Sequence, residues 1–126
     1  MPLPIAPEDS GYDHAHAVEL AKAAGVTDAE LAEAEAFAEE LEAHHAWGLP
    51  FNGYCNAAGY GYVWEPTMGV AQDGWDSHAA FLTLSRGAQT AVVYDSLERG
   101  HDIDRESARQ FLKHERGIII HANQPY

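Results

Sequence analysis

The spacing of apolar residues predicts one long amphipathic helix in the first half of the chain. Over residues 27–47 the apolar side chains recur at helical intervals, and one face carries Leu31, Ala34, Phe37, Ala38, Leu41 and His45. A second face carries Ala29, Ala32, Ala36 and Ala43, so we expect this helix to pack on both sides. Thr27 is the expected N-cap, with Glu30 completing a capping box, and Gly48 followed by Pro50 should end the helix.

A shorter helix is expected before it. Residues 1–9 hold three prolines and should form an extended arm. Ser10 and Asp13 can cap a helix over residues 11–24, which Gly25 would close. Because the connection is so short, the two helices should be direct neighbours, forming an acidic helical hairpin over residues 10–48.

Residues 49–126 change character and favour a small sheet. Tyr60, Tyr62 and Trp64 alternate along an aromatic loop, which predicts a strand with one aromatic face. The runs AAFLTL and TAVVY within residues 79–95, joined by SRGAQ, are typical of a β-hairpin.

A third helix is expected over residues 105–116, with Asp104 as N-cap and Gly117 as terminator, followed by a last strand at residues 118–120. Its inward face would carry Ala108, Phe111 and Leu112. The predicted fold is a single α+β domain of order ααβββαβ, in which the acidic hairpin packs on a mostly antiparallel sheet.

Charge narrows the classes of partner. Of the net charge of −13, residues 1–45 carry −10 and residues 46–126 carry −3. Nucleic acid and anionic membranes require a basic footprint, so neither is expected as a direct partner, whereas a basic protein surface is. The same acidity could instead keep a salt-adapted protein hydrated. The chain has no apolar run of the ~20 residues that span a bilayer and no basic, apolar leader, so a cytoplasmic location, or a virion, is expected.

Residues 17–38 resemble a helix-turn-helix unit. Ala21, Gly25, Val26 and Leu31 stand at the spacings that this family uses for its small residue, its turn glycine and its core apolar positions. The second helix, however, offers carboxylates where the family offers groups that contact DNA. We therefore interpret the match as packing geometry of a helical hairpin, without DNA binding.

Cys55, His78 and Asp95 form a candidate thiol triad. Such chemistry needs a thiolate, an imidazole to accept its proton and a carboxylate to orient the imidazole. Antiparallel pairing of the expected hairpin would bring His78 and Asp95 together. The run from His78 to Asp95 is similar to the His-to-Asp hairpin of transglutaminase-like and arylamine N-acetyltransferase-like enzymes, which have the same Cys–His–Asp order. The glycines that follow Cys55 depart from the long helix those families place there.

The eight histidines raise the question of a metal site. His14 and His16 would point apart on a helix, and Glu42 with His45 has the ExxH spacing of di-iron bundles without matching carboxylates on other helices. His101 and Asp102 form an isolated HD pair. No zinc pattern is present, so no metal and no cofactor are expected.

Together these patterns favour a non-enzymatic binding protein. It would inhibit a basic, nucleic-acid-handling target, as a phage anti-defence or toxin-immunity protein does, with carboxylates in place of phosphates. The expected partner-binding residues are Glu33, Glu35, Glu39, Glu40, Glu42 and Trp75. The alternatives are a structural component of a virion or other assembly, including a homo-oligomer, and the thiol enzyme.

Overall fold

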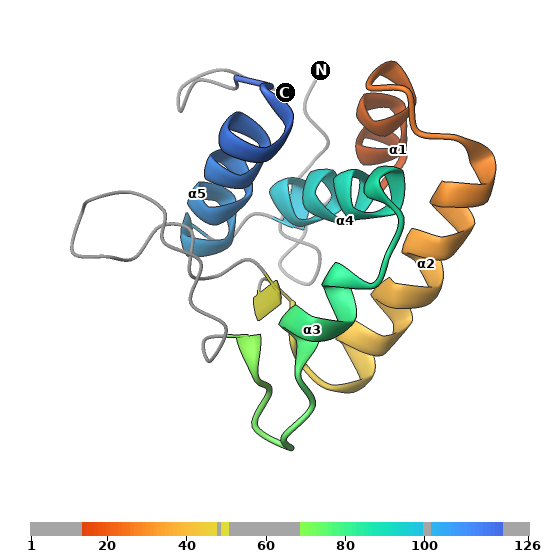
Figure 1. The fold of residues 1–126 in the computed structure, drawn as a ribbon. Helices are drawn as coiled ribbons and strands as arrows, with labels where there is room; N and C mark the ends of the chain where they lie inside the picture. The colour runs from red at the N-terminus through yellow and green to blue at the C-terminus, as the bar shows by residue number, and fades with distance from the viewer. Residues whose placement is uncertain (1–13, 48, 51–68, 100–101, 120–126) are drawn as a thin grey trace.

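The computed structural model describes residues 14–47, 49–50, 69–99 and 102–119, and that part is mostly helical. The elements in order are α1 (His14–Ala23), α2 (Asp28–Ala43), α3 (Ser77–Leu82), α4 (Arg86–Arg99), α5 (Asp102–Phe111) and a π-helical turn, η4 (Leu112–Arg116). Helix α4 lies in the middle, with α1 and α2 on one side and α5 on the other (Figure 1).

The predicted α+β fold is wrong for the described residues. They contain no strand, and their only β-type pairing is an isolated antiparallel bridge between Val70 and Asp76. The expected hairpin of residues 79–95 is instead the end of α3 followed by most of α4. Within the described part of the chain no sheet supports the acidic helices, which pack on α4.

Helix α4 is helical because it is enclosed. Every residue from Thr90 to Glu98 is buried, and Val93 and Leu97 have no exposed surface. A continuous apolar run such as TAVVY fits a buried strand and a buried helix equally well, so periodicity does not distinguish them. Caps at the two helix starts also favour helix here: the Asp76 carboxylate accepts the Ala79 N–H at 3.0 Å at the start of α3, and the Ser85 hydroxyl accepts the Ala88 N–H at 3.3 Å at the start of α4.

The core joins helices from both sides of α4. Phe81 of α3 is fully buried, with its ring centroid 6.1 Å from Phe37 of α2 and 5.6 Å from Phe111 of α5. Tilted and edge-on aromatic pairs at these distances add to the stabilisation from buried area. Ala108, Phe111 and Leu112 are buried as predicted.

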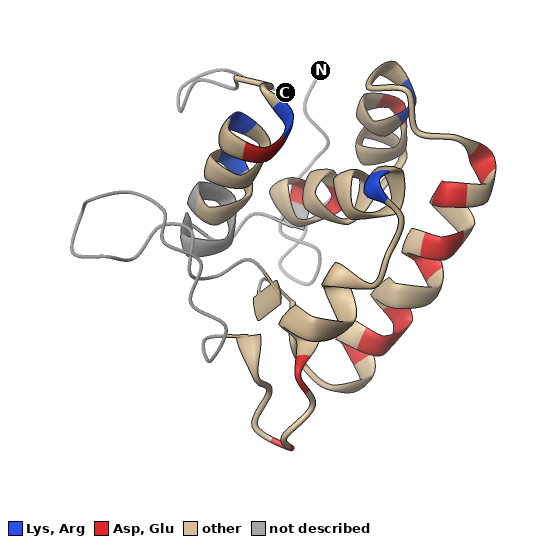
Figure 2. Cartoon of the chain, viewed as in Figure 1, with Lys and Arg blue, Asp and Glu red and all other residues tan. Residues whose placement is uncertain are grey.

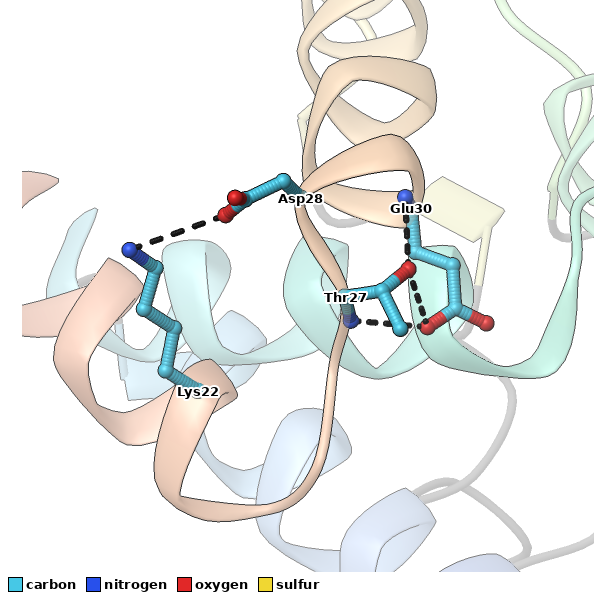
Figure 3. A network of polar contacts seen from close by, with 4 residues as sticks. All are labelled: Lys22, Thr27, Asp28 and Glu30. Carbon is cyan, nitrogen blue, oxygen red and sulfur yellow. Dashed lines mark hydrogen bonds and ion pairs between the residues drawn. The ribbon is translucent and has the colours of Figure 1, made fainter.

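The α1–α2 connection follows the sequence prediction closely. Gly25 closes α1 with a φ of +93°, and Ala21 and Val26 are buried beside it. The Thr27 hydroxyl accepts the Glu30 N–H at 3.2 Å, while the Glu30 carboxylate accepts the Thr27 N–H at 2.9 Å (Figure 3). Both helices pack chiefly on α4 rather than on each other.

Two predictions about α2 are wrong. The helix ends at Ala43 with His44 as C-cap, and the left-handed residue is His45, with a φ of +52°. Only one face of the helix packs, since the alanines of the second face are exposed: Ala29, Ala32, Ala36 and Ala43. The packed face is the predicted one except for His45, which is exposed.

The C-terminal helix starts earlier than expected, at Asp102, and ends in the π-helical turn before Gly117, whose φ is +70°. The predicted strand after it is wrong for its described residues, because Ile118 and Ile119 have no strand partner and Ile119 is 63% exposed. The expected arm at residues 1–9, the caps Ser10 and Asp13, and the aromatic strand at residues 60–64 lie outside the described residues.

Candidate functional site

The carboxylates of α2 are the main candidates for a functional surface, and the structure divides them into two groups. The helix carries seven acidic residues and no Lys or Arg in its 16 residues. Figure 2 shows these acidic positions along the whole length of α2, whereas the Lys and Arg of the described part gather mainly around η4. Two of the carboxylates contact the start of α4 and four face solvent, whereas the seventh, that of Asp28, pairs with Lys22 of α1 at 3.7 Å (Figure 3).

Glu33 belongs to the first group. One of its carboxylate oxygens accepts the Ser85 N–H at 2.9 Å, and the other accepts the Ser85 hydroxyl at 2.7 Å. A negative charge at this position also complements the positive end of the α4 dipole. Glu33, predicted to bind a partner, thus has a structural role at the start of α4.

Glu30 reaches the same end of α4. Its carboxylate is held by Thr27 and also accepts the Gly87 N–H, and these hydrogen bonds hold the pKa of Glu30 below its ordinary value. A Cβ on Gly87 would lie 2.2 Å from this carboxylate, so only glycine fits there without displacing it. Two of the seven acidic side chains therefore stabilise the α2–α4 contact.

The second group consists of exposed side chains: Glu35, Glu39, Glu40 and Glu42. Glu35, Glu39 and Glu40 form no ion pair with any described residue, and Glu42 accepts a hydrogen bond from the Trp47 indole N–H at 2.9 Å. At about 100° per residue, Glu35, Glu39 and Glu42 lie within about 60° of one another around the helix axis. They form an acidic stripe beside the exposed alanine face.

This charge arrangement works against the stability of the helix. Glu35 and Glu39 are like charges at i,i+4, which costs about 0.2–0.5 kcal/mol. Glu40 and Glu42 lie in the last turn, where the helix dipole favours cations, and α2 has no Lys or Arg there. A positive partner along this face would relieve both effects.

Trp75, the predicted aromatic anchor, packs against the end of α2. Its ring stacks on His44 at a centroid distance of 4.3 Å and lies 5.8 Å from the Phe37 ring. Asp73 accepts a hydrogen bond from the Trp75 N–H at 3.0 Å and pairs with His44 Nδ1 at 2.6 Å, and both contacts lower the pKa of Asp73. Trp75 is partly buried, and its neighbours fix its orientation.

The hairpin argument for the thiol triad is overturned, because His78 lies on α3 and Asp95 lies on α4, with no hairpin between them. His78 is buried, its Nδ1 is 3.4 Å from the Pro50 carbonyl oxygen, and burial lowers its pKa. The Asp95 carboxylate lies 3.2 Å from His14 Nδ1. Cys55 lies outside the described residues.

Histidines on α1 pair with buried carboxylates of α4. His16 Nδ1 is 2.6 Å from the Glu98 carboxylate, in parallel with the His14–Asp95 pair, and Glu98 and Asp95 are each 7% exposed. Hydrophobic periodicity does not signal such contacts between residues about 80 positions apart. Within the described ranges, no three His, Cys, Asp or Glu side chains are grouped as metal ligands would be. His101 lies outside those ranges.

A small cavity, which no sequence pattern predicts, lies between α1, α2 and α4. Its volume is about 50 Å³. It is walled mainly by apolar side chains, with polar groups from His14, Glu35 and Asp95.

Comparison with known proteins finds no matching family model, no matching curated protein and no matching solved structure. Among the described helices, none has the length and apolar character needed to cross a membrane.

Proposed function

We propose that this chain is a non-enzymatic binding protein that presents the exposed carboxylates of α2 to a basic protein surface. The observation that carries the proposal is a set of exposed carboxylates on α2, Glu35, Glu39 and Glu40, which form no ion pair with any described residue and lie where negative charge opposes helix stability. The exposed alanines beside it allow a partner's backbone or side chains to approach closely.

The charge density supports a partner that handles nucleic acid. The helix is about 24 Å long at about 1.5 Å per residue. Leaving out Glu30 and Glu33, which contact the start of α4, and Asp28, which pairs with Lys22, its four remaining acidic residues give one charge per about 6 Å. One strand of B-DNA carries a charge per about 3.4 Å along the axis. The two spacings differ by less than about a factor of two, which supports a role in which α2 occupies a basic groove in place of a phosphate backbone and so inhibits the protein that carries the groove.

A Lys-rich amphipathic helical peptide provides a direct test. We expect it to bind the intact protein, with the dissociation constant rising at least about tenfold between 50 and 300 mM NaCl because the contact is electrostatic. The double variant Glu35→Gln and Glu39→Gln should weaken binding at least about fivefold, as each lost charge contact is worth a fraction of a kcal/mol to about 1 kcal/mol.

The matched control changes the same charge elsewhere. Glu19 on α1 and Glu115 on η4 are exposed, so replacing both with Gln alters the net charge equally without touching α2. Equal weakening by both pairs would show that only overall acidity matters, as in a salt-adapted protein, and would contradict the proposal. A dissociation constant that does not change with the NaCl concentration would contradict the proposal as well.

A further inference from the structure

The cavity between α1, α2 and α4 combines apolar walls with two acidic lining residues, Glu35 and Asp95. Ala34, Ala38 and Ala91 are among its apolar lining, and Trp47 lies at the same cavity. A water-sized group needs roughly 10–15 Å³ of such space, so about 50 Å³ accepts roughly four linked heavy atoms. That is the length of the four-carbon stem of a lysine side chain.

The charged groups around the cavity favour a cationic ligand over an anionic or a neutral one. Glu35 is exposed and has no ion pair with a described residue, and Asp95 adds a second carboxylate that is 7% exposed. Among the described residues that line the cavity, His14 is the one basic group, and its Nδ1 lies 3.2 Å from Asp95. An anionic group would be repelled here, whereas a neutral alkyl chain would gain nothing from the carboxylates.

Lysine combines the two properties that the cavity requires. Its aliphatic stem buries readily against apolar side chains while its ammonium group stays at a polar opening. The Trp47 indole adds a ring of the type that attracts cations most strongly. The occupant is thus defined by charge complementarity as well as by volume.

We propose that this cavity is the anchor site for one lysine side chain of the basic partner, with the stem between the alanines and the ammonium group beside Glu35. The inference rests on the proposed function for the identity of the partner as a basic protein. It adds a specific insertion site to what would otherwise be a contact between two charged surfaces. Such a buried anchor would give the partner its register along α2.

Butylamine and 1-butanol are matched probes, since they share a four-carbon chain and differ in charge. In NMR titrations of the whole protein, butylammonium should shift the Trp47 indole resonance and the methyl resonances of Ala34 and Ala38, with affinity on the order of millimolar. Butanol should bind at least about tenfold more weakly. Equal binding of the two probes, or no binding of butylamine, would overturn the anchor site.

Variants on one helix separate the cavity from general acidity. Glu35→Gln should weaken butylamine binding at least about fivefold, and Ala38→Leu should abolish it by filling the cavity. Glu39→Gln removes the same charge from α2 at a residue that does not line the cavity, and it should leave the affinity unchanged. Equal loss in Glu35→Gln and Glu39→Gln would count against a defined site.

The outcomes also distinguish this inference from the proposed function. If the Lys-rich peptide binds through α2 while butylamine leaves the cavity resonances unmoved, the proposed function stands and the anchor site is wrong. If butylamine binds with the expected selectivity but the peptide does not bind, the cavity is a cation site and the proposed function is wrong.

Discussion

The carboxylate of Glu33 on α2 accepts both the backbone N–H and the hydroxyl of Ser85, at 2.9 and 2.7 Å, and Ser85 in turn caps α4. In the sequence, Glu33 is one of several acidic residues expected on the surface of α2. In the structure, its side chain instead stabilises the start of a different helix, α4. Glu33, together with Glu30 beside Gly87, stabilises the packing of α2 against the central helix α4.

Replacing Glu33 with Gln should lower the free energy of unfolding by about 1–3 kcal/mol. The change removes a charge-assisted hydrogen bond and leaves the Ser85 N–H and hydroxyl competing for one acceptor. Urea unfolding at neutral pH measures the loss. The control is Glu39→Gln, an exposed position on the same helix, which should change stability by less than about 0.5 kcal/mol. Equal effects at the two positions would mean that the contact with Ser85 contributes nothing.

Gly87 and Glu30 should be energetically coupled. Alanine in place of Gly87 gains about 0.5–1 kcal/mol of helix propensity, but its Cβ displaces the Glu30 carboxylate and disrupts a capping box worth about 1 kcal/mol. Gly87→Ala should thus be close to neutral in the wild-type protein and stabilising by about 0.5–1 kcal/mol when Glu30 is already Ala. A double-mutant cycle by urea unfolding gives the coupling. The same effect in both backgrounds would show that Glu30 imposes no constraint at Gly87.

His78 should make the protein less stable in mild acid. Its pKa in the folded protein lies below the ordinary value of 6.5, so protons bind the unfolded chain preferentially as the pH falls through that value. Its contribution is therefore full above pH 6.5 and is lost on acidification, by up to about 1.4 kcal/mol between pH 7.5 and 5.5. His78→Gln cannot titrate there, and urea unfolding at the two pH values should show a smaller acid-induced loss for the variant. A loss of the same size in both proteins would argue against a buried, neutral His78.

The two histidine pairs between α1 and α4 should differ in strength. His16→Ala removes a 2.6 Å contact to the buried Glu98 carboxylate and should cost about 1.5–3 kcal/mol. His14→Ala removes a longer contact of 3.2 Å from a side chain that is 54% exposed, and should cost less than about 1 kcal/mol. Thermal or urea unfolding of both variants measures the two losses of stability. A larger loss of stability for His14→Ala than for His16→Ala would contradict the prediction.

Some of this protein could be predicted from neighbouring residues alone. The capping box of Thr27 with Glu30 and the turns at Gly25 and Gly117 involve only residues a few positions apart, and the apolar face of α2 follows from the helical spacing of its own residues. The concentration of acidic residues on one helix is equally a property of the sequence. These features determined α2, its cap and its negative charge.

The remainder depended on partners far away in sequence. The run TAVVY became helix because other helices enclose it, and continuous apolar character does not distinguish a buried helix from a buried strand. Trp75 lies between Gly74 and Asp76, which indicates an exposed loop, yet Phe37 and His44 pack against it. Glu33 accepts hydrogen bonds from Ser85, which is 52 positions away in the sequence. Glu35 and Asp95 line the same cavity only because α2 packs against α4. Contacts between distant segments are set by packing, and packing alone decided which carboxylates stabilise the fold and which remain exposed to solvent.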